Sequence, residues 1–298
     1  GKRVLDSWSK AELGELGHLA LHAILLIVEP PARAELHLAG KVVPLEVADH
    51  GAENCNYLIA TDMDDNPIPG FRFASYDLGY GDMVSMPDWN TVRVLPWQTK
   101  TALVLTNLVH PESHEPIHVS PRQVLRDQVA RAEEMGYTPM VGSEIEFYLF
   151  HDSYREAHEK GFKSLSPHSP WMQDYQIVQT TFDEYVIGDI RRNLEGAGIP
   201  VECSKGEADA GQEEVNAKYS DAMDTSDMHS IIKLGVKQIA QTHGASVTFM
   251  AKYDHRKAGS SSHIHQSLWK DGKPAFKDGG KPAGKPAKPA AGKGKPKK

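Results

Sequence analysis

The order of apolar and polar positions in the first third of the chain predicts short strands joined by turns. Apolar or β-branched runs occupy residues 92–95 and 102–109, between polar breaks. Turn-forming residues gather at 64–67 and again at 69–70. Strand-length runs bounded by turn residues are typical of a small sheet domain. We therefore expect residues 1–112 to form a domain of mixed helix and sheet.

From residue 120 onward the pattern alternates between helical and strand periods, which is typical of an α/β arrangement. Two stretches, 120–123 and 181–184, have the spacing of helix-capping boxes. Each predicts a helix that ends at a glycine, near residues 136 and 196 respectively. Further elements are predicted as strands at 138–150, 199–203, 211–220, 245–252 and 260–269 and as a long helix at 221–243. We expect this second domain to cover 113–276.

Composition places the chain among soluble globular proteins. Of its 298 residues, 40% are hydrophobic and 24% are charged, and the formal net charge of −7 disfavours general nucleic-acid binding. The cysteines are Cys55 and Cys203, which predicts no disulfide framework and a reducing, cytoplasmic setting. The apolar run at 19–28 is broken by His22 and preceded by acidic residues. It is shorter than the ~20 residues of a membrane span and unlike a secretion signal, so a core element is expected.

Composition changes abruptly after Phe276. Residues 277–298 contain only Lys, Pro, Ala, Gly and one Asp. Such a stretch cannot bury an apolar core, so a disordered basic tail is predicted. A solvated tail is the simpler interpretation, and contact with nucleic acid or another acidic surface is the alternative.

The stretch GSEIEFYLF at 142–150 places two carboxylates inside an apolar strand. Side chains alternate between the faces of a strand, so Glu144 and Glu146 project together while Ile145 and Phe147 point to the core. A solvated strand face explains such a pair when it is taken alone. Two buried carboxylates side by side repel each other unless a cation neutralises them, and a divalent metal ion does this efficiently.

Further candidate ligands have the same strand geometry. His263 and His265 share one face, and Glu207 and Glu214 bracket a turn. Glu213 is expected to face away from Glu214, on the other side of its strand. A surface histidine pair and a solvated loop acid are the ordinary alternatives. Oxygen-rich ligands without a thiolate suit Mg²⁺ or Mn²⁺, and such ions commonly hold nucleotide phosphates. The sequence has neither a Walker A loop nor a G-x-G-x-x-G motif.

Several motifs in order resemble the glutamine synthetase family. They are GSEIEFYLF, SKGEADAGQEEVN at 204–216, TFMAK at 248–252 and GSSSHIHQSLW at 259–269. The resemblance implies an α+β fold, with an N-terminal β-grasp-like domain and a catalytic α/β barrel that is incomplete at its C-terminus. It implies that ATP phosphorylates the γ-carboxylate of glutamate and that ammonia or an amine displaces the phosphate, in a homo-oligomer with no membrane partner.

The resemblance also implies a role for individual residues, carried over by motif. One divalent ion is implied to lie among the carboxylates of Glu146, Glu207 and Glu214. The second ion is implied to lie between Glu144 and His263, so the implied catalytic residues are Glu207, Glu214 and His263. His265 and Ser267 are implied to lie near the ATP phosphates, Gly259 near glutamate, and Tyr175 near the amine.

The chain departs from the family pattern in ways that leave the function open. The family's acidic residue for ammonium is missing around 73–75, which favours a larger amine. Ala258 replaces a common asparagine, and no arginine follows Arg256, although the family uses later arginines to bind phosphates. We therefore expect a recognisable site with little or no ligase activity. A non-catalytic, metal-binding structural protein and a metal-dependent hydrolase remain alternatives.

Overall fold

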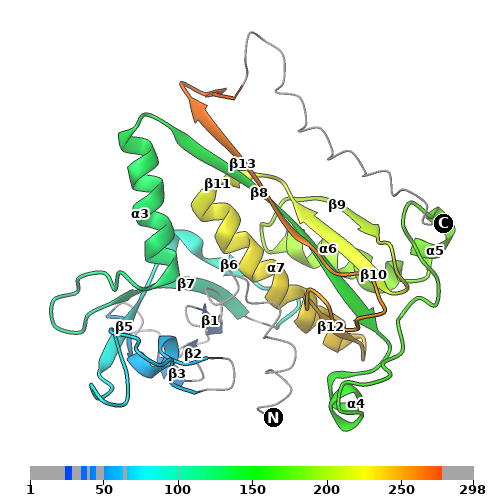
Figure 1. Ribbon diagram of the computed structural model, residues 1–298, viewed down its shortest axis with the longest axis horizontal. Helices are drawn as coiled ribbons and strands as arrows, with labels where there is room; N and C mark the ends of the chain where they lie inside the picture. Colours follow the sequence, from blue (N-terminus) through cyan, green and yellow to red (C-terminus); the bar gives the residue numbers. More distant parts are fainter. Residues whose placement is uncertain are drawn as a thin grey trace, which may run out of the picture.

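The computed structural model describes residues 24–28, 35–38, 41–44, 50–62, 66–99 and 101–276, and the tail predicted at 277–298 lies outside these ranges. Within them, helices and strands combine in an α+β fold with two seven-stranded sheets. Every named strand pairing in both sheets is antiparallel. Figure 1 shows the blue and cyan strands of the first sheet to one side of the green-to-orange strands of the second.

The first sheet is built by residues of the N-terminal third. Its strands are β1 (Ile24–Val28), β2 (Glu35–Leu38), β3 (Lys41–Pro44), β4 (Ala52–Cys55), β5 (Asp82–Pro87), β6 (Arg93–Val94) and β7 (Thr101–Val109). Their order is β3-β2-β1-β7-β5-β4, with β6 also paired to β7. Two short 3₁₀ helices, η2 (Asn56–Ile59) and η3 (Trp89–Thr91), lie between strands. The strands predicted at 92–95 and 102–109 are confirmed as β6 and β7.

The second sheet is organised around one long strand. Its strands are β8 (Thr138–Phe150), β9 (Val201–Gly206), β10 (Gln212–Ala217), β11 (Ser220–Asp221), β12 (Ser246–Thr248), β13 (Ser262–Lys270) and β14 (Lys273–Pro274). The order is β14-β13-β8-β10-β9, and β11 and β12 also pair with β8. In Figure 1, β13 follows β8 along its length. Because β8 pairs with both β10 and β13, alternate side chains of these three strands project from the same face of the sheet.

Helices pack against the opposite face of this sheet. The helices among the described residues are α3 (Pro121–Glu134), α4 (Tyr154–Glu159), α5 (Ile177–Thr181), α6 (Glu184–Gly196) and α7 (Ala222–Thr242), and α6 and α7 form most of this layer. Apolar residues of α6 and α7, including Ile190 and Ile231, form one core with Ile145 and Phe147 of β8. This burial confirms the predicted inward face of β8 and leaves its alternate residues, among them Glu144 and Glu146, on the other face.

Several predicted elements are confirmed and others are shifted. The strand at 138–150 and the long helix near 221–243 form as predicted, as β8 and α7. Asp271 and Gly272 have φ angles of 52° and 70°, which fit a tight hairpin turn between β13 and β14. The strand predicted at 245–252 is shorter, because only 246–248 pair with β8. The strand predicted at 199–203 lies later, at 201–206.

Both predicted capping boxes are wrong. Ser120 does precede α3, but its side chain makes no capping bond, and Gln123 donates instead to Asp127. The Thr181 hydroxyl donates to the Ile177 carbonyl oxygen in α5, so α6 begins after Asp183. Sequence spacing alone cannot tell whether a hydroxyl will accept from the following turn or donate to the preceding one.

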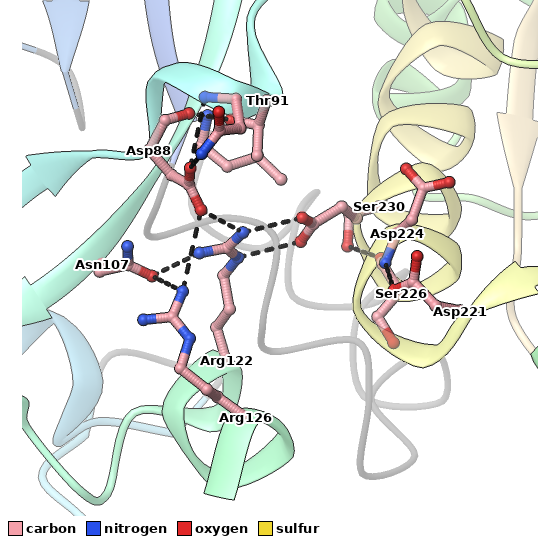
Figure 2. A network of polar contacts seen from close by, with 12 residues as sticks. Asp88, Thr91, Asn107, Arg122, Arg126, Asp221, Asp224, Ser226 and Ser230 are labelled. Atoms are coloured by element: carbon pink, nitrogen blue, oxygen red, sulfur yellow. Dashed lines mark hydrogen bonds and ion pairs between the residues drawn. The ribbon is translucent and has the colours of Figure 1, made fainter. Parts of the chain in front are cut away.

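Arg122 of α3 links helix α7 to the first sheet through a network of polar contacts (Figure 2). Its guanidinium donates to both oxygens of Asp227 on α7, at 3.0 and 2.9 Å, and to Asp88 Oδ2 at 3.0 Å. It also donates to Asn107 of β7, which accepts a second bond from Arg126. The Arg122 side chain is only 10% exposed. Its charge is therefore compensated by Asp227 of α7 on one side and by Asp88, which precedes η3, on the other. In the ranges that the structure covers, no helix is long and apolar enough to cross a bilayer.

Candidate metal centre

Three carboxylates converge on the face of the second sheet that the helices leave uncovered. Glu146 of β8 and Glu214 of β10 are directly paired across the two strands, and Glu207 follows β9. One oxygen from each carboxylate lies within 4.8 Å of the others. Glu146 and Glu214 are 8% and 7% exposed. The structure thus brings together the three residues that the sequence associated with one ion.

Neighbouring amides hold these carboxylates in place. Gln212 Nε2 donates to Glu146 Oε2 at 3.0 Å, and the Ser261 backbone amide donates to the same oxygen at 2.9 Å. Asn216 Nδ2 donates to Glu214 Oε1 at 2.6 Å, so Glu214 and Asn216 share a face as predicted. Orientation by such outer partners is typical of metal-ligating carboxylates.

Electrostatics at this cluster favour a cation. Burial raises the pKa of Glu214, and the nearby Glu207 carboxylate raises it further, against the opposing effect of the Asn216 hydrogen bond. A hard divalent ion bound by carboxylate oxygens would compensate this repulsion. The donor set, three carboxylates and no thiolate, therefore fits Mg²⁺ or Mn²⁺ better than Zn²⁺.

A second polar group lies one strand away, around Glu144. Glu144 of β8 is directly paired with His263 of β13. His263 Nδ1 lies 3.0 Å from Glu144 Oε2, and His265 Nε2 lies 2.8 Å from Glu144 Oε1. Burial acts to raise the pKa of Glu144, but the hydrogen bonds with His265 and His263 outweigh it and lower that pKa. The family resemblance predicted that Glu144 would share an ion with His263 only, whereas the imidazoles of both His263 and His265 contact the Glu144 carboxylate.

The other residues singled out from the sequence lie around these two groups. Ser267 is also on β13, where its hydroxyl accepts from Trp269 Nε1 at 3.0 Å. The Gly259 carbonyl accepts from Gln212 Nε2 at 3.0 Å, which links it to the amide that holds Glu146. A Cβ at Gly259 would lie 2.9 Å from the Ala251 carbonyl oxygen, so a side chain there would force the backbone to shift. Tyr175 lies before α5, is 85% exposed and has a φ of 55°.

Glu213 faces away from the three carboxylates, as predicted. It is 2% exposed on the helix-covered side of β10. Burial and the neighbouring Asp183 raise its pKa well above the usual range for a glutamate. Asp183 in turn contacts His168 Nδ1 at 2.5 Å and accepts from Gln173 Nε2 at 2.6 Å. Glu213 is therefore part of a buried polar network and not of the candidate metal centre.

Sequence reasoning missed Lys205 and Asp174. Lys205 Nζ lies 2.5 Å from Glu207 Oε1 and 3.0 Å from Asp174 Oδ1. Lys205 belongs to the SKGE motif, and its place opposite Glu214 follows from the pairing of β9 with β10. Lys205 and Glu207 are two residues apart, the spacing that puts side chains on one side of an extended chain, and this was a usable signal for a shared site. Nothing in the sequence indicated that Asp174 would fold over β9.

Comparison with known proteins agrees with this geometry. Residues 118–289 match the family model described as the catalytic domain of glutamine synthetase. The match covers more than half of the chain and includes both polar groups. The chain belongs to the glutamine synthetase family.

Curated relatives in this family include amine ligases. The γ-glutamylethanolamide synthetase GlnA4 of Streptomyces coelicolor is 42% identical over 236 residues, which cover 79% of this chain and 51% of that protein. A glutamate–isopropylamine ligase from a Pseudomonas species is 36% identical over 218 residues, which cover 73% of this chain and 47% of that protein. The chain thus spans about half the length of these relatives.

Solved structures support the fold. A structure described as GmaS without ligand has a TM-score of 0.66 and 24% identity, covering 89% of this chain and 59% of that one. A glutamine synthase homologue has a TM-score of 0.68 and 21% identity, covering 81% of this chain and 55% of that one. These likenesses establish a glutamine-synthetase-like arrangement of helix and sheet.

Proposed function

We propose that the chain carries metal-binding machinery of an ATP-dependent ligase that joins the γ-carboxylate of glutamate to an amine. The observation that supports this most strongly is the convergence of Glu146, Glu207 and Glu214 beside the Glu144–histidine group. The family match and the two amine-ligase relatives support the same chemistry. In this proposal γ-glutamyl phosphate forms first, and the amine displaces its phosphate.

Two divalent ions, Mg²⁺ or Mn²⁺, belong to the proposal. The first would be held by the three clustered carboxylates, and the second by Glu144 and His263. When bound, such ions neutralise charge on the phosphoryl oxygens during transfer. The chain's own groups prepare both sites, because Gln212 and the Ser261 amide fix Glu146 while the two imidazoles fix Glu144. His265 and Ser267 are proposed near the ATP phosphates, and Gly259 near glutamate.

An amine larger than ammonia is the proposed second substrate. Residues 73–75, FAS, contain no acid where ammonia-using members are expected to carry one. The relatives named as a γ-glutamylethanolamide synthetase and a glutamate–isopropylamine ligase favour the same choice. Tyr175 is proposed to border the amine. A β-grasp-like domain at 1–112, a catalytic barrel domain from 113, a homo-oligomeric assembly and a cytoplasmic location complete the proposal. The cysteines Cys55 and Cys203 are both free.

Phosphate release tests this function. The chain would be incubated with ATP, Mn²⁺ or Mg²⁺, glutamate and a panel of amines, with Glu146→Gln as the inactive control. Release that depends on both glutamate and an amine would support the proposal, and the expected rate is low. Release without glutamate would instead indicate a metal-dependent hydrolase. No release from a chain that still binds Mn²⁺ would indicate a non-catalytic member of the family.

A further inference from the structure

Three hydrogen-bonded side chains connect the buried polar network beside Glu213 to the surface of α6. Asp183 Oδ1 lies 2.5 Å from His168 Nδ1, and His168 Nε2 lies 2.8 Å from the hydroxyl oxygen of Tyr185. The side chains of His168 and Asp183 are 3% and 1% exposed, whereas Tyr185 is 55% exposed. A carboxylate, an imidazole and a phenol hydroxyl therefore follow one another, and of the three residues Tyr185 is the one that solvent reaches.

Both nitrogens of the His168 imidazole have a defined partner, which fixes the position of its proton. Because a carboxylate only accepts, Asp183 holds the proton on Nδ1, and the bare Nε2 accepts the hydrogen bond of the Tyr185 hydroxyl. The ring of His151 stacks on the imidazole with centroids 4.2 Å apart, and the His168 backbone amide donates to the Leu149 carbonyl oxygen at 2.9 Å. The imidazole is thus held in one orientation toward Tyr185.

Asp183 is itself fixed by its neighbours. Its Oδ2 accepts from Gln173 Nε2 at 2.6 Å, and its backbone carbonyl oxygen accepts from the amides of Val186 and Ile187 at 2.9 Å in the first turn of α6. A carboxylate positioned behind an imidazole stabilises the imidazolium that forms when the imidazole takes up a proton. His168 can therefore act as a base toward the hydroxyl that its other nitrogen contacts.

The arrangement has the three parts of an activated nucleophile, which are a hydroxyl, a base and a group that orients the base. A tyrosine hydroxyl is a weak nucleophile while it keeps its proton. His168 removes this limit, because it can accept the proton while the oxygen attacks. Asp183 lies beside Glu213, on the helix-covered side of the sheet, so these groups are separate from the candidate metal centre.

We propose that Tyr185 is a site of covalent modification, where its hydroxyl accepts an acyl group from an activated acyl donor with His168 as general base. The tyrosine oxygen forms a bond to the acyl carbon while His168 Nε2 takes the phenol proton. The bond between the acyl carbon and the leaving group then breaks, and the leaving group departs with the electron pair and receives the proton from His168. The product is a tyrosine ester. This step does not depend on the proposed ligase function.

Labelling of the full 298-residue chain with p-nitrophenyl acetate, read out by peptide mass spectrometry, tests the proposal. Tyr76 and Tyr219 are internal references, because they are 83% and 58% exposed and their hydroxyls contact no histidine in the part of the chain that the structure describes. Tyr185 should be acetylated about a hundredfold faster than either reference, which is the contribution expected of a general base. In His168→Asn the rate at Tyr185 should fall to about that of the references.

His243→Asn is the matched control. The His243 ring meets the Tyr185 ring edge-on with centroids 5.7 Å apart and does not bond its hydroxyl, so this variant should be labelled like the parent. A rate at Tyr185 no higher than that of the references in the parent chain would overturn the proposal without any variant, as would an undiminished rate in His168→Asn. Circular dichroism checks that each variant is folded. Because labelling needs no metal, ATP or glutamate, its result is independent of phosphate release.

Discussion

Glu146 and Glu214 are directly paired across β8 and β10, with both carboxylates on the face that α6 and α7 leave open. Glu213, one residue earlier, is on the other face and is buried against Asp183. Glu213 and Glu214, which are adjacent in β10, therefore lie in two different environments. This alternation allows the two glutamates to be compared within the same strand.

Replacing Arg122 should destabilise the contact between α7 and the first sheet. Arg122→Met keeps the length of the stem but leaves Asp88 and Asp227 without their shared cation, and Asp227 has an 11% exposed side chain. We expect the free energy of unfolding to fall by about 3 kcal/mol, measured by urea denaturation. The control is Arg256→Met, which removes an exposed ion pair with Asp254. Equal midpoints for the two variants would contradict the structural role of Arg122.

His229 should make the chain less stable in acid. Burial, aided by Lys233, lowers the pKa of His229 to about 4, while Nδ1 lies 2.7 Å from the Ser143 hydroxyl. Above pH 6.5 the imidazole is neutral in both states and has no effect. As pH falls from 6.5 to 4, the unfolded chain takes up a proton that the folded chain does not, which destabilises the fold by about 3 kcal/mol.

His229→Asn isolates this effect from that of other titrating groups. The asparagine keeps a polar atom near Ser143 but has no proton to gain in this range. Urea denaturation at pH 7 and pH 4.5 should show a smaller loss of stability for the variant than for the parent. The same loss in both proteins would mean that His229 does not titrate as the structure indicates.

Gly206→Ala should displace the loop that carries Asp174 and Tyr175. The new Cβ would meet the Gln173 side chain at 2.3 Å, so the loop must shift away from β9. We expect a loss of about 1–3 kcal/mol in unfolding free energy, typical of overpacking. Fluorescence-monitored denaturation measures it. Gly272→Ala in the exposed turn, where no atom lies within 4 Å of the added Cβ, separates steric crowding from the strain of a positive φ, since Gly206 is not in that region. Unchanged stability of Gly206→Ala would show that the loop yields freely.

The face of each candidate ligand was predictable from sequence, but the assembly of ligands was not. Alternation in β8 correctly separated Glu144 and Glu146 from Ile145 and Phe147, because strand geometry is local. Bringing Glu146 opposite Glu214 requires β8 to pair in register with β10, a strand far away along the chain: the Gln212–Glu146 hydrogen bond between these two strands spans 66 residues. That register depends on packing of the whole sheet.

Local rules failed where tertiary contacts compete with them. Thr181 has the spacing of a helix cap, yet its hydroxyl bonds backward to Ile177, and Asp183 is engaged by buried partners. The contacts of Asp174 and Tyr175 with Lys205 depend on a loop in which Tyr175 has a positive φ, and a tyrosine in the sequence does not predict that conformation. The hairpin at Asp271–Gly272 was predictable because its turn residues alone determine it.

Calorimetric titration with Mn²⁺ tests the central claim most directly. Glu146→Gln should weaken Mn²⁺ binding by about a hundredfold, because it removes one of three converging carboxylates. Glu213→Gln should bind like the parent, because its carboxyl is on the other face of the sheet. Equal Mn²⁺ affinity in the parent and Glu146→Gln, or an equal loss in both variants, would contradict a metal centre at Glu146, Glu207 and Glu214.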